Sequence, residues 1–111
     1  MELDVTKEQS GTTCTVMLNG EVDVYTSPRL KQELGDLIDA GCVDLVVGLD
    51  GLSFIDSSGL GVLVSALRRA KEHGGTLRLV CTSEAILKIF RITGLDKVFP
   101  LFSEVEEARG F

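Results

Sequence analysis

Residues 43–63 read VDLVVGLDGLSFIDSSGLGVL, an apolar run followed by a polar junction and a helix start. The run from Val43 to Leu49 is apolar on both faces except at Asp44, which predicts a central strand covered on both sides. Asp56-Ser57-Ser58-Gly59 then opens a helix, and leucines and valines follow at helical spacing. Gly74-Gly75 ends that helix, so the stretch predicts one strand-helix unit of an α/β sheet.

The residues before this unit predict two strands and a helix. Leu3 and Val5 alternate with polar neighbours, and a second apolar run follows Gly11, which indicates two strands joined at that glycine. Thr26-Ser27-Pro28 is typical of a helix start, with an N-cap hydroxyl before a proline at the first helical position. We expect this helix to end at Gly41.

The residues after the unit predict another strand over Thr76 to Cys81 and a third helix over Ser83 to Ile92 that stops at Gly94. A last short strand is expected over Val98 to Phe102. Ser103-Glu104-Val105-Glu106 has the spacing of a capping box, so the chain should end in a short helix. No linker or repeat interrupts the pattern, and we expect a single α/β domain over residues 1–111 with crossover connections.

The composition narrows the possible functions. The 111 residues are 44% hydrophobic and 25% charged, as in a soluble globular domain, and the formal net charge is −6. That charge disfavours direct binding to nucleic acid, which requires clustered Lys and Arg. Because no leader-like segment and no run of 18 uncharged apolar residues occurs, we expect a cytoplasmic protein without a membrane span.

The three cysteines, Cys14, Cys42 and Cys81, match neither a redox motif nor a zinc site. All three sit among apolar residues, so we expect buried thiols in a reducing cytoplasm. No other pattern in the sequence indicates a metal or a cofactor.

The junction from Asp56 to Gly61 has the least ordinary composition. Asp56 is a good N-cap, and a phosphate on Ser57 would meet the positive end of the helix and its free amides. Gly59 and Gly61 each cost helix stability, roughly 1 kcal/mol relative to alanine, which suggests that another molecule approaches there. The residues alone also allow a simpler interpretation, in which this tetrapeptide only starts a helix.

The string D-S-S-G-L-G-V-L, Asp56 to Leu63, resembles the signature of the anti-sigma factor antagonists of the STAS domain family. Gly20-Glu21-Val22-Asp23 is similar to that family's G-E-x-D segment, and Arg91 to Leu95 is similar to its helix-ending stretch. The likeness covers nearly the whole chain and is closest to the actinobacterial single-domain members of this bacterial family. It implies a STAS-like fold, a mixed central sheet of about four to five strands with about four helices.

The resemblance also implies a mechanism of partner switching in transcription regulation. Ser57 would be phosphorylated by an anti-sigma factor that is itself a serine kinase, with Asp56 orienting the acceptor hydroxyl. The unphosphorylated protein would bind that anti-sigma factor and free a sigma factor, and a separate serine phosphatase would reset it. The residues expected around the phosphoacceptor or against the partner are Asp56, Ser58, Gly59, Gly61, Val62, Ser65, Glu21 and Asp23.

Three other functions would make different demands on the sequence. A serine hydrolase would need a base, and the sole histidine, His73, is predicted far along the same helix, where we expect it to be solvent-exposed. A receiver-like phosphoacceptor at Asp56 would require an acidic pair after the first strand, where Lys7-Glu8-Gln9 stands instead. We therefore expect no enzyme activity. A STAS subunit of a larger regulatory complex remains the alternative within the family.

Overall fold

A computed structural model describes residues 2–110, and Met1 and Phe111, the two ends of the predicted domain, lie outside the described residues. The elements follow one another as β1 (Leu3–Ser10), β2 (Thr13–Val22), α1 (Ser27–Asp39), β3 (Asp44–Ile55), α2 (Ser57–Glu72), β4 (Thr76–Val80), α3 (Glu84–Thr93), a 3-10 helix η1 (Leu95–Lys97), β5 (Leu101–Phe102) and α4 (Val105–Arg109). Within residues 2–110, no helix combines the length and the apolar character that crossing a bilayer requires.

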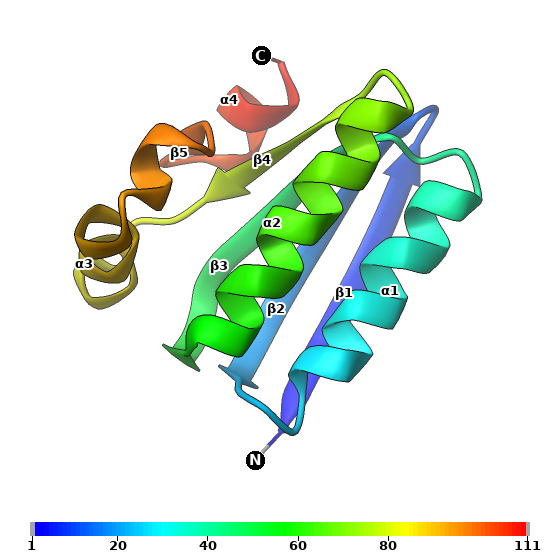
Figure 1. Ribbon diagram of the computed structural model, residues 1–111. Helices are drawn as coiled ribbons and strands as arrows, with labels where there is room; N and C mark the ends of the chain where they lie inside the picture. The colour runs from blue at the N-terminus through cyan, green and yellow to red at the C-terminus, as the bar shows by residue number, and fades with distance from the viewer. Residues whose placement is uncertain (1, 111) are drawn as a thin grey trace.

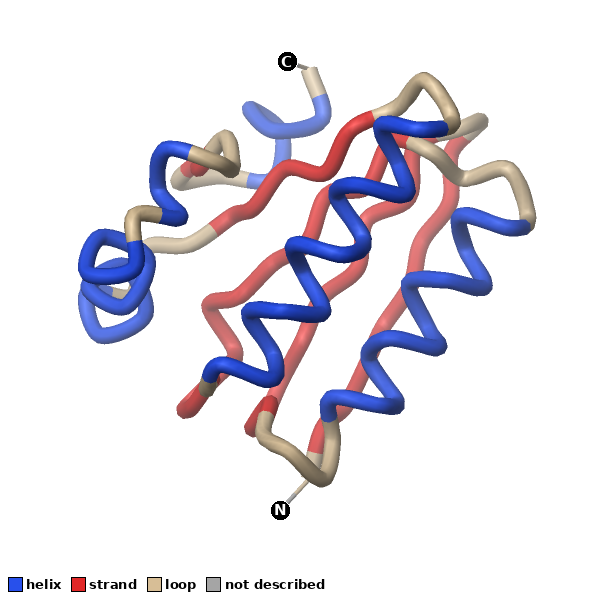
Figure 2. The backbone as a smooth tube through the Cα atoms, in the orientation of Figure 1, coloured by secondary structure: helices blue, strands red, loops and turns tan. Residues whose placement is uncertain are grey.

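The five strands form one mixed sheet in the order β1-β2-β3-β4-β5. The β1 and β2 strands form an antiparallel hairpin, whereas β2, β3, β4 and β5 are parallel to their neighbours. Figure 1 shows α1 and α2 lying side by side across one face of the sheet, and Figure 2 shows the same layers by element type. The predicted α/β class, the mixed sheet and the central place of the strand before α2 are confirmed.

The central strand β3 packs on both faces. Leu45, Val47 and Leu49 are completely buried in the main core, which lies beneath α1 and α2. Because side chains alternate along a strand, Val46 points to the other face, where it packs in a smaller cluster with Ala108 of α4. A strand covered on both sides is thus confirmed at its centre.

The structure corrects the lengths of two predicted strands. The β3 strand continues to Ile55, because Phe54 and Ile55 still pair with the end of β2. The junction with α2 is therefore the single residue Asp56, and not a loop that begins after Leu49. The last strand contains only Leu101–Phe102, because the amides of Val98 and Phe99 donate to the Leu95 carbonyl oxygen in the turn that follows η1.

Two predicted caps are wrong, although both helices exist. The hydroxyl of Thr26, the N-cap residue of α1, donates to the Glu21 carbonyl oxygen at 2.8 Å instead of capping the helix. The capping box at Ser103–Glu106 does not form, because the N-cap of α4 is Glu104 and its side chain makes no capping hydrogen bond. Local spacing identified these helices but not the bonds at their ends.

The expectation of three thiols is also corrected. All three cysteines are buried, but Cys14 of β2 and Cys42, which precedes β3, form a disulfide with a Cα–Cα distance of 6.0 Å. Cys81 is a free thiol, and burial raises its pKa. The pairing joins residues 28 positions apart, so it depends on β2 lying beside β3 and not on local spacing.

Candidate functional site

The predicted phosphoacceptor loop lies at the carboxyl ends of two neighbouring parallel strands. Val22 of β2 pairs with Ile55 of β3, and the Asp56 amide donates to the Val22 carbonyl oxygen at 3.1 Å. Asp23 and Asp56 thus follow adjacent strands at one edge of the sheet, where α1 and α2 begin (Figure 1). Functional residues of open α/β sheets collect at this kind of edge.

The Asp56 carboxylate caps α2, as predicted. Its Oδ1 atom accepts hydrogen bonds from the Ser58 amide at 2.9 Å and the Gly59 amide at 3.3 Å. The same oxygen accepts a hydrogen bond from the Ser58 hydroxyl. The Ser58 hydroxyl, followed by these amides, lowers the pKa of Asp56 below its ordinary value of 3.8. Asp56 is therefore held as an anion at the helix start.

Ser57 is the more accessible of the two serines. Its side chain is exposed, whereas Ser58 is half-buried. Among residues 2–110 the Ser57 hydroxyl has no hydrogen-bond partner. The expectation that Asp56 orients the Ser57 hydroxyl is corrected here, because the carboxylate holds the hydroxyl of Ser58 instead.

The amides that we expected to receive a phosphate on Ser57 are already occupied. Those of Ser58 and Gly59 both donate to Asp56. A phosphate on Ser57 would compete with a carboxylate for the same donors, and two anions at one helix end repel each other. Such a phosphate would therefore project toward solvent or a partner.

The two glycines of the motif lie in different surroundings. A Cβ atom on Gly59 would lie 2.5 Å from Val22 Cγ1 and 2.9 Å from Ile55 Cγ1, so this glycine lets α2 approach the sheet. Gly61 is exposed, and a Cβ atom there would meet nothing within 4 Å. Only Gly61 keeps the surface open to another molecule.

Asp23 stabilises the loop between β2 and α1. Its side chain is only 4% exposed, and Oδ1 accepts from the Tyr25 amide at 2.8 Å and the Thr26 amide at 3.0 Å. Its Oδ2 atom is buried without a hydrogen-bond partner in the described part of the chain. Glu21 is half-buried beside it at the end of β2. The structure thus brings both acids to the predicted edge, but Asp23 faces its own loop and not the surface.

Val62 and Ser65 lie on the side of α2 that continues from Ser58, four and seven residues further along the helix. Both are half-buried and line a small hollow against α1, together with Gly35 and Arg69. The solvent-exposed side of α2 contains Ser57, Gly61 and Arg68, which are separated by four and then seven residues. Val62 and Ser65 are thus only partly exposed, and their contact with a partner stays a prediction.

Three exposed apolar side chains at the carboxyl ends of β2 and β3 were not predicted as part of the site. They form what we call the apolar rim, which consists of Val24, Tyr25 and Phe54, with exposed fractions of 64%, 82% and 43%. Val24 and Tyr25 follow β2, and Phe54 lies two residues before Asp56. Large apolar residues next to both polar junctions were a signal in the sequence. A hollow of about 370 Å³ beside Tyr25 adjoins the rim.

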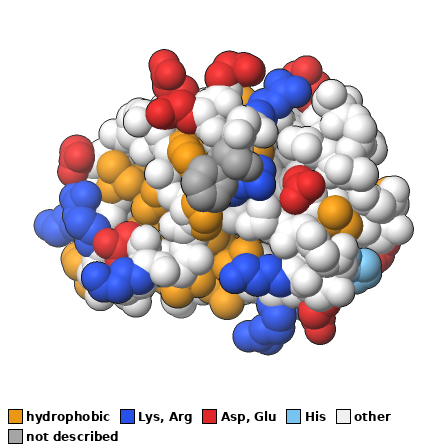
Figure 3. All heavy atoms as spheres, turned by 90° about the horizontal axis from the view of Figure 1, so that it is seen from above, with side chains coloured by type: hydrophobic (Ala, Val, Ile, Leu, Met, Phe, Trp, Pro, Cys, Tyr) orange, Lys and Arg blue, Asp and Glu red, His pale blue; other side chains and the backbone are white. Residues whose placement is uncertain are grey.

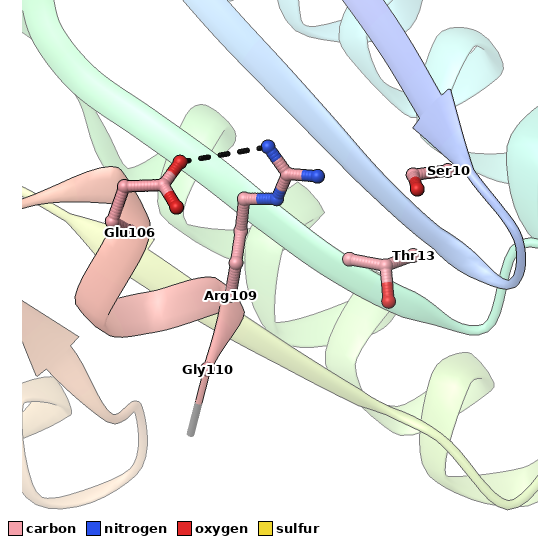
Figure 4. A pocket seen from close by; sticks show the side chains of 5 residues that line it. All are labelled: Ser10, Thr13, Glu106, Arg109 and Gly110. Carbon is pink, nitrogen blue, oxygen red and sulfur yellow. Dashed lines mark ion pairs between the residues drawn. The ribbon is translucent and has the colours of Figure 1, made fainter.

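Another hollow lies at the opposite end of the sheet. It has a volume of about 360 Å³ and is lined by Ser10, Thr13, Glu106, Arg109 and Gly110 (Figure 4). Arg109 extends from α4 toward the β1-β2 turn, 3.7 Å from the Glu106 carboxylate. Figure 3 views the molecule from this end, where acidic, basic and apolar side chains are mixed. This hollow is not part of the site at Ser57.

Comparison with known proteins identifies the family. Residues 4–108 match the STAS domain. The chain belongs to the STAS domain family. It is similar to an anti-sigma-B factor antagonist of Bacillus subtilis (strain 168), with 36% identity over 106 residues and 96% of each chain covered. An antagonist of the same name from Staphylococcus aureus (strain NCTC 8325 / PS 47) is 38% identical over 80 residues, which cover 72% of this chain and 74% of the relative.

The fold of this STAS domain is also found in solved relatives. The crystal structure of an anti-sigma factor antagonist from Mycobacterium paratuberculosis superposes with a TM-score of 0.89 at 28% identity, and covers 98% of this chain and 92% of the other. The resemblance inferred from Asp56 to Leu63 is thus confirmed at the level of family and fold.

Proposed function

We propose that this STAS domain is an anti-sigma factor antagonist that binds an anti-sigma factor through the surface around Ser57 and thereby frees a sigma factor. The observation that carries the proposal is the exposed Ser57 hydroxyl, which makes no hydrogen bond to any described residue. The exposed side chains of the apolar rim add apolar surface at the same ends of β2 and β3. Exposed aromatic side chains are typical anchors of protein–protein interfaces. The two curated relatives, both named as antagonists of an anti-sigma factor, support this partner class.

Phosphorylation of Ser57 would switch this binding off. A phosphoserine adds about −1.5 to −2 charges at neutral pH. The nearby amides already bind Asp56, so the helix start offers little compensation for that charge. Burying an uncompensated charge in an interface costs several kcal/mol, and each 1.4 kcal/mol weakens binding about tenfold. The modification could therefore dissociate the complex without unfolding either protein.

The partner, and not this chain, would perform the catalysis. An anti-sigma factor that is a serine kinase would supply the nucleotide site and the magnesium ligands, and a serine phosphatase would reverse the step. His73, the only histidine, follows the C-terminal end of α2, and Ser57 begins that 16-residue helix, which is about 24 Å long at 1.5 Å per residue. His73 therefore lies too far away to act as a base for Ser57.

The test is phosphorylation by a candidate anti-sigma kinase, with wild type, Ser57→Ala and Ser58→Ala. We expect the wild type and Ser58→Ala to accept phosphate and Ser57→Ala to accept none. In parallel, Ser57→Asp should lose the anti-sigma factor in a pull-down that retains it on the wild type. Undiminished phosphorylation of Ser57→Ala, or equal binding of Ser57→Asp, contradicts the proposal.

A further inference from the structure

We propose that Asp56 determines which of the two adjacent serines accepts the phosphoryl group, because it binds the Ser58 hydroxyl and leaves the Ser57 hydroxyl free. This inference rests on the proposed function, since it concerns the choice of acceptor within the same site. It gives Asp56 the opposite role from the one implied by the family resemblance, which was to orient the acceptor itself.

The geometry fixes the Ser58 hydroxyl. Asp56 Oδ1 accepts from the Ser58 hydroxyl, the Ser58 amide and the Gly59 amide. Three donors from one helical turn thus converge on a single carboxylate oxygen, and they leave the Asp56 side chain little freedom to move away. Ser58 is also half-buried, whereas Ser57 is exposed with its hydroxyl free of hydrogen bonds to residues 2–110.

The charge of Asp56 disfavours attack by Ser58. A hydroxyl nucleophile has to approach the phosphorus to about 3 to 3.5 Å, and the γ-phosphoryl oxygens that surround it are anionic. At Ser58 these oxygens would meet the Asp56 carboxylate, which accepts a hydrogen bond from the attacking hydroxyl. The lowered pKa of Asp56 keeps its carboxylate charged, so it repels the anionic oxygens of the γ-phosphoryl group.

The transfer itself involves Asp56 in no covalent step. A bond forms between Ser57 Oγ and the γ-phosphorus of a nucleoside triphosphate that the kinase holds. The bond from that phosphorus to the β–γ bridging oxygen breaks, and a nucleoside diphosphate leaves. The hydroxyl proton passes to a base of the kinase. Asp56 is thus a positioning residue that acts through Ser58.

The first test maps the phosphorylated serine in the variants Asp56→Gly, Ser57→Ala and the double variant Ser57→Ala/Asp56→Gly. Glycine removes the carboxylate but is well tolerated as an N-cap. In the double variant, phosphorylation of Ser58 should rise about tenfold or more over Ser57→Ala, which corresponds to about 1.4 kcal/mol of activation free energy. Asp56→Gly alone should still accept phosphate on Ser57. That result would show that the kinase still binds the variant.

Two results of this experiment would overturn the inference. One is a folded double variant whose Ser58 is phosphorylated no faster than in Ser57→Ala. The other is a folded Asp56→Gly protein that accepts phosphate on neither serine, because Asp56 would then be a docking group for the kinase.

A second test needs no kinase and separates this inference from the proposed function. The Asp56 carboxyl is titrated by NMR in the wild type, in Ser58→Ala and in the matched control Ser57→Ala. We expect Ser58→Ala to raise the pKa of Asp56 toward its ordinary value and Ser57→Ala to leave it unchanged. An equal pKa in all three proteins excludes the hydrogen bond and the inference with it. A wild type phosphorylated on neither serine contradicts only the proposed function.

Discussion

Gly59 of α2 lies directly against Val22 of β2. A Cβ atom on this glycine would come within 2.5 Å of Val22 Cγ1, closer than carbon atoms of two side chains can pack. The first turn of α2 therefore sits closer to the sheet than a helix with any larger residue at position 59 could. This close approach is also what sets Asp56, Ser57 and Ser58 at the strand edge.

Gly59→Ala should leave the free energy of unfolding unchanged or lower it by up to about 2 kcal/mol, whereas Gly61→Ala should raise it. Overpacking at Gly59 costs about 1 to 3 kcal/mol, of which the better helix propensity of alanine returns roughly 1 kcal/mol. At Gly61, where a Cβ atom meets open space, the propensity gain stands alone, at roughly 0.5 to 1 kcal/mol. Urea unfolding of both variants checks this pair, and equal effects would contradict the packing at Val22.

Reduction of the Cys14–Cys42 disulfide should lower the free energy of unfolding. The bond closes a loop across 28 positions, for which the loss of chain entropy predicts about 3 to 4 kcal/mol. Urea unfolding with and without a reductant measures the difference, and Cys81→Ser is the control, since Cys81 is not in the bond. A count of three free thiols in the denatured, unreduced protein would contradict the disulfide.

The stability contributed by Asp56 should depend on pH. Its pKa is lower in the folded protein than the ordinary value of 3.8, so folding favours its charged form. That contribution is complete above about pH 4, near the pKa of an unfolded aspartate, and disappears as the pH falls through the lower folded pKa. The wild type should therefore be more stable than Asp56→Asn at neutral pH, and this difference in stability should disappear in strong acid. Urea unfolding midpoints at each pH measure it. A difference that stays constant with pH contradicts this.

Tyr25→Ala and Phe54→Ala should each weaken binding of the anti-sigma factor by about tenfold or more, because buried aromatic anchors contribute more than about 1.4 kcal/mol to an interface. Ile92→Ala is the matched control, since Ile92 of α3 is 74% exposed outside the apolar rim. Calorimetry measures affinity, and circular dichroism confirms that each variant is folded. The same loss in Ile92→Ala would show that the effect is not specific to the rim.

Much of the fold could be predicted because it depends on local patterns. The continuous apolar run after Val43 predicted a central strand, and it lies in the middle of the sheet. Asp56 was identified as an N-cap from its residue type and place, and its carboxylate does accept two first-turn amides. Element lengths were predicted less well, since strand pairing with β2 extends β3 to Ile55.

The details of the site could not be predicted in the same way. Nothing in the residue types of Ser57 and Ser58 tells which hydroxyl a neighbouring carboxylate binds, because that depends on the direction of the first helical turn. Asp23 was expected to face a partner, yet the loop folds its carboxylate onto the amides of Tyr25 and Thr26. Hydrogen bonds over two or three residues depend on backbone angles that composition does not specify.

The sequence by itself determined the α/β order of elements, the family and the strand-to-helix junction at Asp56, because hydrophobic period and capping chemistry act over a few residues. The tertiary structure alone decided that Gly59 packs against Val22, that Cys14 meets Cys42, and that the three side chains of the apolar rim are exposed. These relationships join residues on different strands and helices. They arise only when the parallel sheet brings the ends of β2 and β3 together.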